Sequence, residues 1–495
     1  MKTKRRSLHL PNIIHHLTEE KLALVVSFTV LVVFSFEVFR ILKNWDMLVR
    51  VLNARHIFSG GYYYEPIRAV LESFIIGLFS FASSAYSVYL FIFFVSVVFL
   101  LSVFYLSRQI KLNFQYLFMF LLSPFILFYG IKNGSDLLVI SFLIFYVAAI
   151  IGEKPIFAGL FLALAFVSKS YALLFSPLLL FFLWNRNLKG VYRLFLALVT
   201  AVAALVPYLI FNLLEYGNFI YSMAASYLYF QIFSSYVSLS VSLAHFESVP
   251  LIGFEEIIFP MLLIVMFFLM DRKYFLGKVM KNKRQYAIIL SACVLSFVVY
   301  FSVSNLMNAT GLSVFRFILP LSVFTYILAF MFFRQNYFRF IYILFVASIV
   351  IAFLIFNSNA AIVFHISYAK GAVTMFNSVY SGNCTVSSNE WVYLDYLGLY
   401  AVPYEPYQNY SGAILNFGRV NTTLPLIETR GNIYLYGLKT CSYYPSIQES
   451  RLYYDMSQGD IPNNACYWLF GIRPDIKQLY GLCNSTNSFF SNVFK

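Results

Sequence analysis

The segment NWDMLVRVLNARHIFSGGYYYEPIR, residues 44–68, separates the first long apolar stretch of the chain from all the later ones. It places a lone carboxylate, Asp46, beside a tryptophan and just beyond the end of a predicted membrane helix. A carboxylate at a membrane boundary is a candidate functional residue. The alternative is structural, because Asp is also a favoured N-cap residue and a short amphipathic helix is predicted directly after Asp46.

Composition identifies the broad class of protein. Hydrophobic residues make up 61% of the 495 residues, aromatic residues 20% and charged residues only 11%. So few charges cannot cover a water-soluble surface of this size, which predicts a polytopic membrane protein. The net charge of +14 comes mainly from short Lys and Arg clusters between apolar runs. That distribution is typical of membrane orientation signals, and no nucleic acid partner is expected.

Apolar runs of about 20 residues, each long enough to cross hydrocarbon, predict about eleven transmembrane helices. If residues 1–21 are cytoplasmic, nearly every basic cluster falls inside, which predicts a multi-pass plasma-membrane protein with a retained signal anchor. The predicted all-α membrane domain covers residues 22–368, with outer loops at 43–83, 131–136 and 212–256. The predicted spans begin near Leu22, Ser84, Phe114, Ser135, Pro155, Ala172, Leu194, Ile257, Tyr286, Phe315 and Phe338.

The C-terminal part has a different character. Its short mixed segments, broken by Gly, Pro and Asn, predict a small extracytoplasmic α+β or mainly β domain at 369–495. Its many tyrosines fit either strand positions or a sugar-stacking surface. Acceptor sequons and an even number of cysteines fit a glycoprotein with two disulfides, whose pairing is open. The glycosylation candidates are Asn383, Asn409, Asn421 and Asn484, and the disulfide candidates are Cys384, Cys441, Cys466 and Cys483.

Several familiar catalytic motifs are absent from the sequence. It contains no Walker loop, no G-x-S-x-G elbow, no H-E-x-x-H and no zinc-like Cys/His spacing. The sequence therefore predicts no specific cofactor. A divalent metal would need distant carboxylates such as Asp46, Asp136 and Glu247 to converge, and that question stays open.

What remains is a group of polar residues at the outer ends of the predicted spans. A helix over residues 49–58 would lie in the interface plane and present Arg50 and Arg55 as a basic edge. Cations beside a carboxylate suit a lipid-linked phosphate donor, because the cations would bind the phosphate while the carboxylate takes a proton from an acceptor hydroxyl. The group comprises Asp46, Arg50, Arg55, His56, Glu65, Arg68, Lys132, Asp136, Lys169 and Tyr171.

Two segments resemble the GT-C superfamily of membrane glycosyltransferases. The first, DMLVRVLNARHIFSGGYYYEP at 46–66, is similar to the first outer loop of that family, with its Asp, its Gly-Gly helix end and its aromatic-Pro element. The second joins NGSD at 133–136 to AGLFLALAFVSKSYALLFSP at 158–177. It is similar to the family's stretch between the third and sixth spans, and both segments follow the family's order.

The resemblance implies an inverting, outward-facing transferase that uses a polyprenyl- or dolichyl-phosphate sugar and is mannosyltransferase-like. Asp46 would be the catalytic base, Lys169 would bind the donor phosphate, and Asp136 would support the site or the acceptor. Arg68 matches a basic residue that follows the aromatic-Pro element in some members, although RAVL stands here in place of the usual Pro-Pro-Leu. Arg316, at the outer end of its predicted span, is a further candidate for the phosphate.

The acceptor is not specified by the sequence. The chain has no WWDxG motif, which argues against an oligosaccharyltransferase subunit, and Met47 after Asp46 argues against a protein O-mannosyltransferase. The expected partners are the lipid-phosphate sugar, a glycan, lipid or protein acceptor, and membrane lipids. The main alternative is a flippase or transporter for a lipid-linked glycan. An O-antigen polymerase or ligase and a structural membrane glycoprotein are further alternatives, and an archaeal surface protein is a reasonable source.

Overall fold

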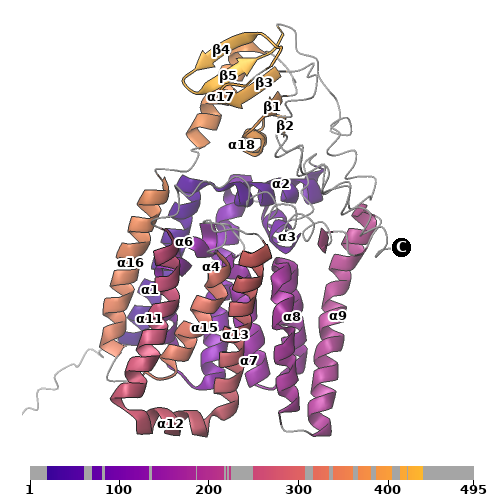
Figure 1. Ribbon diagram of the computed structural model, residues 1–495. Coiled ribbons are helices and arrows are strands. Elements are labelled where there is room, and N and C mark those ends of the chain that lie inside the picture. Colours follow the sequence, from indigo (N-terminus) through magenta and orange to yellow (C-terminus); the bar gives the residue numbers. More distant parts are fainter. Residues whose placement is uncertain are drawn as a thin grey trace, which may run out of the picture.

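The computed structural model shows a mainly helical chain with a small sheet toward its C-terminal end (Figure 1). The structure describes residues 19–60, 68, 70–80, 84–132, 136–184, 187–216, 219, 222–223, 249–306, 316–333, 338–360, 366–380, 386–403, 413–420 and 422–438. Several predicted features lie outside these residues: Glu65, Glu247, the glycosylation candidates Asn383, Asn409, Asn421 and Asn484, and the cysteines Cys384, Cys441, Cys466 and Cys483.

The bundle fits the predicted polytopic membrane protein. Among the described residues, five helices are long and apolar enough to cross a membrane, or six if a bent pair counts as one span, against about eleven predicted. The five long helices are α1 (Glu19–Leu42), α4 (Ser84–Ile110), α9 (Leu188–Tyr216), α13 (Lys283–Leu306) and α16 (Phe338–Ala360). The other apolar helices are α7 (Asp136–Ile151), α8 (Pro155–Ser168), η3 (Ser170–Leu183), α11 (Val249–Met270) and α15 (Leu319–Phe330).

The bent pair consists of α5 (Phe114–Leu121) and α6 (Pro124–Lys132), which meet at 70°. The cause is Pro124, which has no backbone N–H to continue α5 and disfavours the helical conformation of the residue before it. Proline is well suited to the first position of a new helix, and α6 starts there. The sequence predicted a single span that begins near Phe114 in this stretch.

Several of the basic clusters that were predicted to be cytoplasmic lie together at one end of the bundle. Glu153, between α7 and α8, pairs with Arg193 of α9 and with Arg284 of α13 (3.0 Å). The basic helix α12 (Arg272–Lys281) lies across this same end (Figure 1). The grouping of these loops agrees with the predicted sidedness, and which side of the membrane they face stays a prediction.

At the other end, α2 (Trp45–Ser59) and α3 (Val70–Leu78) lie across the bundle (Figure 1). Above them the C-terminal part combines helices with a five-stranded mixed sheet of order β2-β1-β3-β5-β4, in which β1 pairs in parallel and β5 antiparallel with its neighbours. Its elements are α17 (Ile366–Val379), β1 (Val386–Ser388), α18 (Trp391–Tyr396), β2 (Ala401–Pro403), β3 (Ala413–Phe417), β4 (Leu426–Arg430) and β5 (Ile433–Tyr436).

Candidate functional site

The candidate site begins at the first turn of α2. The Asn44 side chain caps this helix, because its oxygen accepts a hydrogen bond from the Asp46 N–H at 2.8 Å. Gly60 ends the helix in the left-handed conformation, at φ 66°. The capping role that the sequence left open for Asp46 therefore belongs to Asn44. The Asp46 carboxylate instead pairs with Arg68 at 2.7 Å, and both side chains are 16% exposed.

Arg50 lies one turn further along α2 and is buried. Its Nε donates to Glu72 Oε2 of α3 at 2.9 Å, and its Nη1 donates to the backbone carbonyl of Asp46 at 2.8 Å. Glu72 is completely buried. Burial raises the pKa of Glu72 to about 7, although the charge of Arg50 opposes the shift. Arg50 thus ties α3 to the helical turn that carries Asp46.

The predicted basic edge of α2 is wrong. Residues five positions apart are about 140° apart around a helix, so Arg50 and Arg55 cannot share one edge. Arg50 turns inward to Glu72, whereas the Arg55 guanidinium donates to the backbone carbonyls of Asp395 and Tyr396, each at 3.3 Å.

A second ion pair joins Lys169 to Asp136, and the Asp136 side chain is only 1% exposed. The pair forms because α7 and α8 are antiparallel and of similar length: Asp136 starts α7, while Lys169 follows the last residue of α8. The start of one helix therefore meets the end of the other. The charges of both residues act on Glu72, which places this pair beside the first group.

Two further contacts complete the arrangement. Lys132, at the end of α6, interacts electrostatically with Asp46 and lies over the Phe128 ring at 5.0 Å. The Lys169 Nζ lies 5.8 Å from the centre of the Phe317 ring, which also contacts Tyr171. We call Asp46, Arg50, Arg68, Glu72, Lys132, Asp136 and Lys169 the charged cluster.

Two further predicted site residues, His56 and Arg316, do not belong to the charged cluster. The His56 ring lies 3.0 Å from Glu215, at the end of α9. Arg316 directly precedes Phe317, whose ring contacts Lys169, in a short helical turn, η5 (Arg316–Ile318). The Arg316 side chain is outside the described residues. Glu72 was missed by the sequence analysis, because only its three-dimensional pairing with Arg50 distinguishes it.

The cations of the charged cluster can bind an anion, and its carboxylate oxygens can accept hydrogen bonds or bind a cation. It contains four cations and three carboxylates, one of which, Glu72, has its pKa raised to about 7. Two buried carboxylate oxygens, Glu72 Oε1 and Asp136 Oδ2, have no hydrogen-bond partner among the described residues. They are where a water or a divalent cation would find acceptors. The described residues contain no group of three His, Cys, Asp or Glu side chains suited to a metal.

The C-terminal domain forms one wall beside the cluster. Trp45, next to Asp46, contacts Trp391 edge to face at 5.8 Å and Tyr393 at 6.0 Å between ring centres. Both of these rings belong to α18 and are almost fully buried. The Arg55 guanidinium lies over the Tyr396 ring at 5.6 Å. Aromatic and cation–π contacts therefore hold α18 on the helix that carries Asp46.

Comparison with known proteins adds no family to this picture. No protein-family model matches the chain, and no curated protein matches it.

Proposed function

We propose that this protein is a membrane glycosyltransferase of the GT-C type that transfers a sugar from a polyprenyl-phosphate donor to an acceptor hydroxyl with inversion. The observation that carries the proposal is the Asp46 carboxylate, held by Arg68 at the end of the bundle beside Arg50, Lys132 and Lys169. Such a transfer needs a carboxylate base beside cations, because the reaction releases one proton, which the base accepts, and one phosphate leaving group, which the cations bind.

In the proposed reaction the acceptor oxygen attacks the anomeric carbon as the bond from that carbon to the phosphate oxygen breaks. The acceptor proton passes to the Asp46 carboxylate, and the bonding electron pair leaves with the phosphate. In the structure, Lys169 pairs with Asp136 and Arg68 pairs with Asp46. The donor phosphate would take over part of these contacts, with Lys132 adjacent and Arg316 as a further candidate.

The proposal also includes a topology. The five other apolar helices pack among the long ones, and we propose that they and the bent α5–α6 pair cross the membrane as well, which gives about eleven spans. The charged cluster would then face outward, with the C-terminal domain above it. A lipid-linked donor would approach from the outer leaflet.

The test is sugar transfer in membranes that contain the protein, measured with a panel of radiolabelled polyprenyl-phosphate sugars. Membranes without the protein are the control. Transfer that depends on the protein would support the proposal and name the donor. No transfer with any donor, together with movement of a lipid-linked glycan across proteoliposomes, would contradict it.

That second outcome would fit a flippase or transporter, which is the other candidate function. One observation favours it: the α5–α6 pair is a broken helix with a 70° bend, a feature of many transporters. The charged cluster differs from the transporter pattern in one respect, because Lys132, Asp136 and Lys169 lie at the ends of helices.

A further inference from the structure

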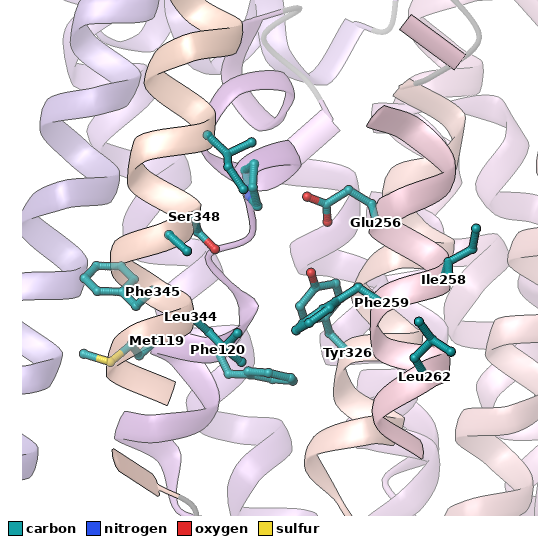
Figure 2. A pocket seen from close by; sticks show the side chains of 13 residues that line it. Met119, Phe120, Glu256, Ile258, Phe259, Leu262, Tyr326, Leu344, Phe345 and Ser348 are labelled. Carbon is teal, nitrogen blue, oxygen red and sulfur yellow. The ribbon is translucent and has the colours of Figure 1, made fainter. Parts of the chain in front are cut away.

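A cavity of about 380 Å³ lies at the level of the α5–α6 break, between α11, α15 and α16 (Figure 2). Its volume falls in the range of about 300–1,000 Å³ that is common for small-molecule sites. Its walls are mainly apolar and include Phe120, Phe259, Leu262, Leu344, Phe345 and Ala347. The cavity therefore suits a hydrocarbon chain.

The inner end of the cavity is polar. The Glu256 carboxyl group points into it, with the Tyr326 hydroxyl directed toward the carboxyl and Ser348 on the opposite wall (Figure 2). Glu256 is only 5% exposed. A carboxyl group buried this deeply within an apolar bundle is costly and calls for a specific role.

Part of that role is structural. Glu256 Oε1 accepts a hydrogen bond from the Phe125 N–H at 3.3 Å, and Oε2 accepts one from the Ser322 hydroxyl at 3.3 Å. The first of these satisfies an amide that the helix break leaves without an intrahelical partner. The hydroxyls of Ser123 and Tyr326 also donate to this carboxyl group. The roughly four acceptor positions of a carboxylate are therefore taken, and a ligand hydroxyl at Glu256 would have to take the place of the Tyr326 hydroxyl, which lines the cavity.

The cavity opens sideways between α11 and α16. Ile258 and Leu262 of α11 and Ile351 of α16 line it and are 44–60% exposed on the surface of the bundle. These same residues would face lipid in a membrane. A lipid chain can therefore enter from the bilayer without passing through the charged cluster.

We propose that this cavity binds a long-chain alcohol, with its hydrocarbon chain between α11 and α16 and its hydroxyl donating to Glu256. The described residues that line the cavity include no Lys or Arg, so a phosphate headgroup would meet an acid and no cation among them. A protonated amine would have to be taken out of water, at a cost of several kcal/mol. A hydroxyl avoids both penalties and can also accept a hydrogen bond from Tyr326 or Ser348.

This site is separate from the proposed transferase site. Pro124 lines the cavity and Lys132 belongs to the charged cluster, so the two sites lie at opposite ends of α6, roughly 12 Å apart along its axis. The proposal does not depend on sugar transfer. Binding can be measured on the purified full-length chain.

The experiment measures binding of radiolabelled geranylgeraniol to the purified protein in detergent, in competition with the matching hydrocarbon, phosphate ester and amine. We expect saturable binding that the alcohol competes for best. Glu256→Leu should weaken it about tenfold, the usual effect of losing a hydrogen bond to a charged group. Equal competition by the hydrocarbon, or stronger competition by the phosphate ester or the amine, would overturn the proposal.

A second pair of variants guards against loss of folding in Glu256→Leu. Ala347→Phe fills the cavity from the α16 side and should abolish binding. Val350→Phe adds the same ring to a lipid-facing position of the same helix that does not line the cavity, and it should bind as the wild type does. Unchanged binding in Ala347→Phe would contradict the assignment of the site.

Discussion

Arg50 is the residue that joins the parts of the charged cluster. It contacts the Glu72 side chain and the Asp46 backbone at once, and it is 3% exposed. A buried guanidinium with two such partners is strongly fixed in position. The geometry of Asp46 therefore depends on a residue that does not itself need to touch substrate.

Lys169 tests the proposed phosphate site. Lys169→Met should raise the KM for the donor more than it lowers kcat, because a phosphate contact contributes to donor binding. Lys189→Met, an exposed lysine at the other end of the bundle, is the control. A donor KM equal to that of the wild type would argue against this role.

The same substitution should also reduce stability. It leaves Asp136 buried without its cation, which typically costs about 3–5 kcal/mol. Adding Asp136→Asn removes the unpaired charge, so the double variant should unfold at a higher temperature than Lys169→Met alone. If the double variant unfolds at a lower temperature than Lys169→Met alone, Lys169 and Asp136 do not act as a pair.

The raised pKa of Glu72 should make the stability of the protein depend on pH. Burial raises the pKa of its carboxyl from 4.5 to about 7 in the folded state. Below pH 4.5 the group is protonated in both states and has no effect. Between pH 4.5 and 7 the unfolded chain loses the proton while the folded chain keeps it, so the free energy of unfolding falls as the pH rises.

The measurement is the melting temperature in detergent across that pH range. Glu72→Gln should flatten the slope, whereas Glu428→Gln, on strand β4, should leave it as it is in the wild type. An unchanged slope in Glu72→Gln would mean that Glu72 titrates normally.

At the level of elements, α2 connects the bundle to the C-terminal domain. One of its faces carries Arg50 into the bundle, and another meets α18 through Trp45 and Arg55. The sequence predicted this helix, because its amphipathic pattern and its Gly-Gly end are local signals. Its position at the membrane interface stays a prediction. The sequence did not predict the α18 contact, because the two segments are more than 300 residues apart in the chain.

Trp391 tests this connection. Trp391→Ala should cost about 3–5 kcal/mol of stability by leaving a cavity in the core of the domain. It should also lower transfer, because α2 loses a support beside Asp46. Trp184→Ala removes a tryptophan that is 48% exposed and is the control. Wild-type transfer in Trp391→Ala would show that docking of α18 does not position Asp46.

For the whole molecule, composition and apolar runs predicted the membrane class and the helical bundle. They could not predict how many helices cross, because a buried helix and a membrane span have similar sequences and differ mainly in length. The α5–α6 break shows the difficulty, since one apolar run holds two helices at 70°. The sequence likewise could not predict the pairing of Asp46 with Arg68 or of Asp136 with Lys169, because the fold brings these distant residues together.

Orientation can be measured by labelling single cysteines, introduced into a cysteine-free background, with a membrane-impermeant maleimide. Ser59→Cys, exposed at the end of α2, should react in intact cells. Lys273→Cys, exposed on α12, should react only after the cells are opened. The reverse pattern would place the charged cluster inside the cell and contradict the proposed topology.

The central claim is that Asp46 accepts the proton of the acceptor hydroxyl, and the most direct measurement is the transfer rate of purified Asp46→Asn with the donor identified for the wild type. Asn keeps the size of the side chain and removes its basicity, so the rate should fall about 10²- to 10⁴-fold in a protein that still unfolds in a cooperative melting transition. Glu215→Gln changes a carboxylate outside the charged cluster and should keep the wild-type rate. A wild-type rate in Asp46→Asn would contradict the account.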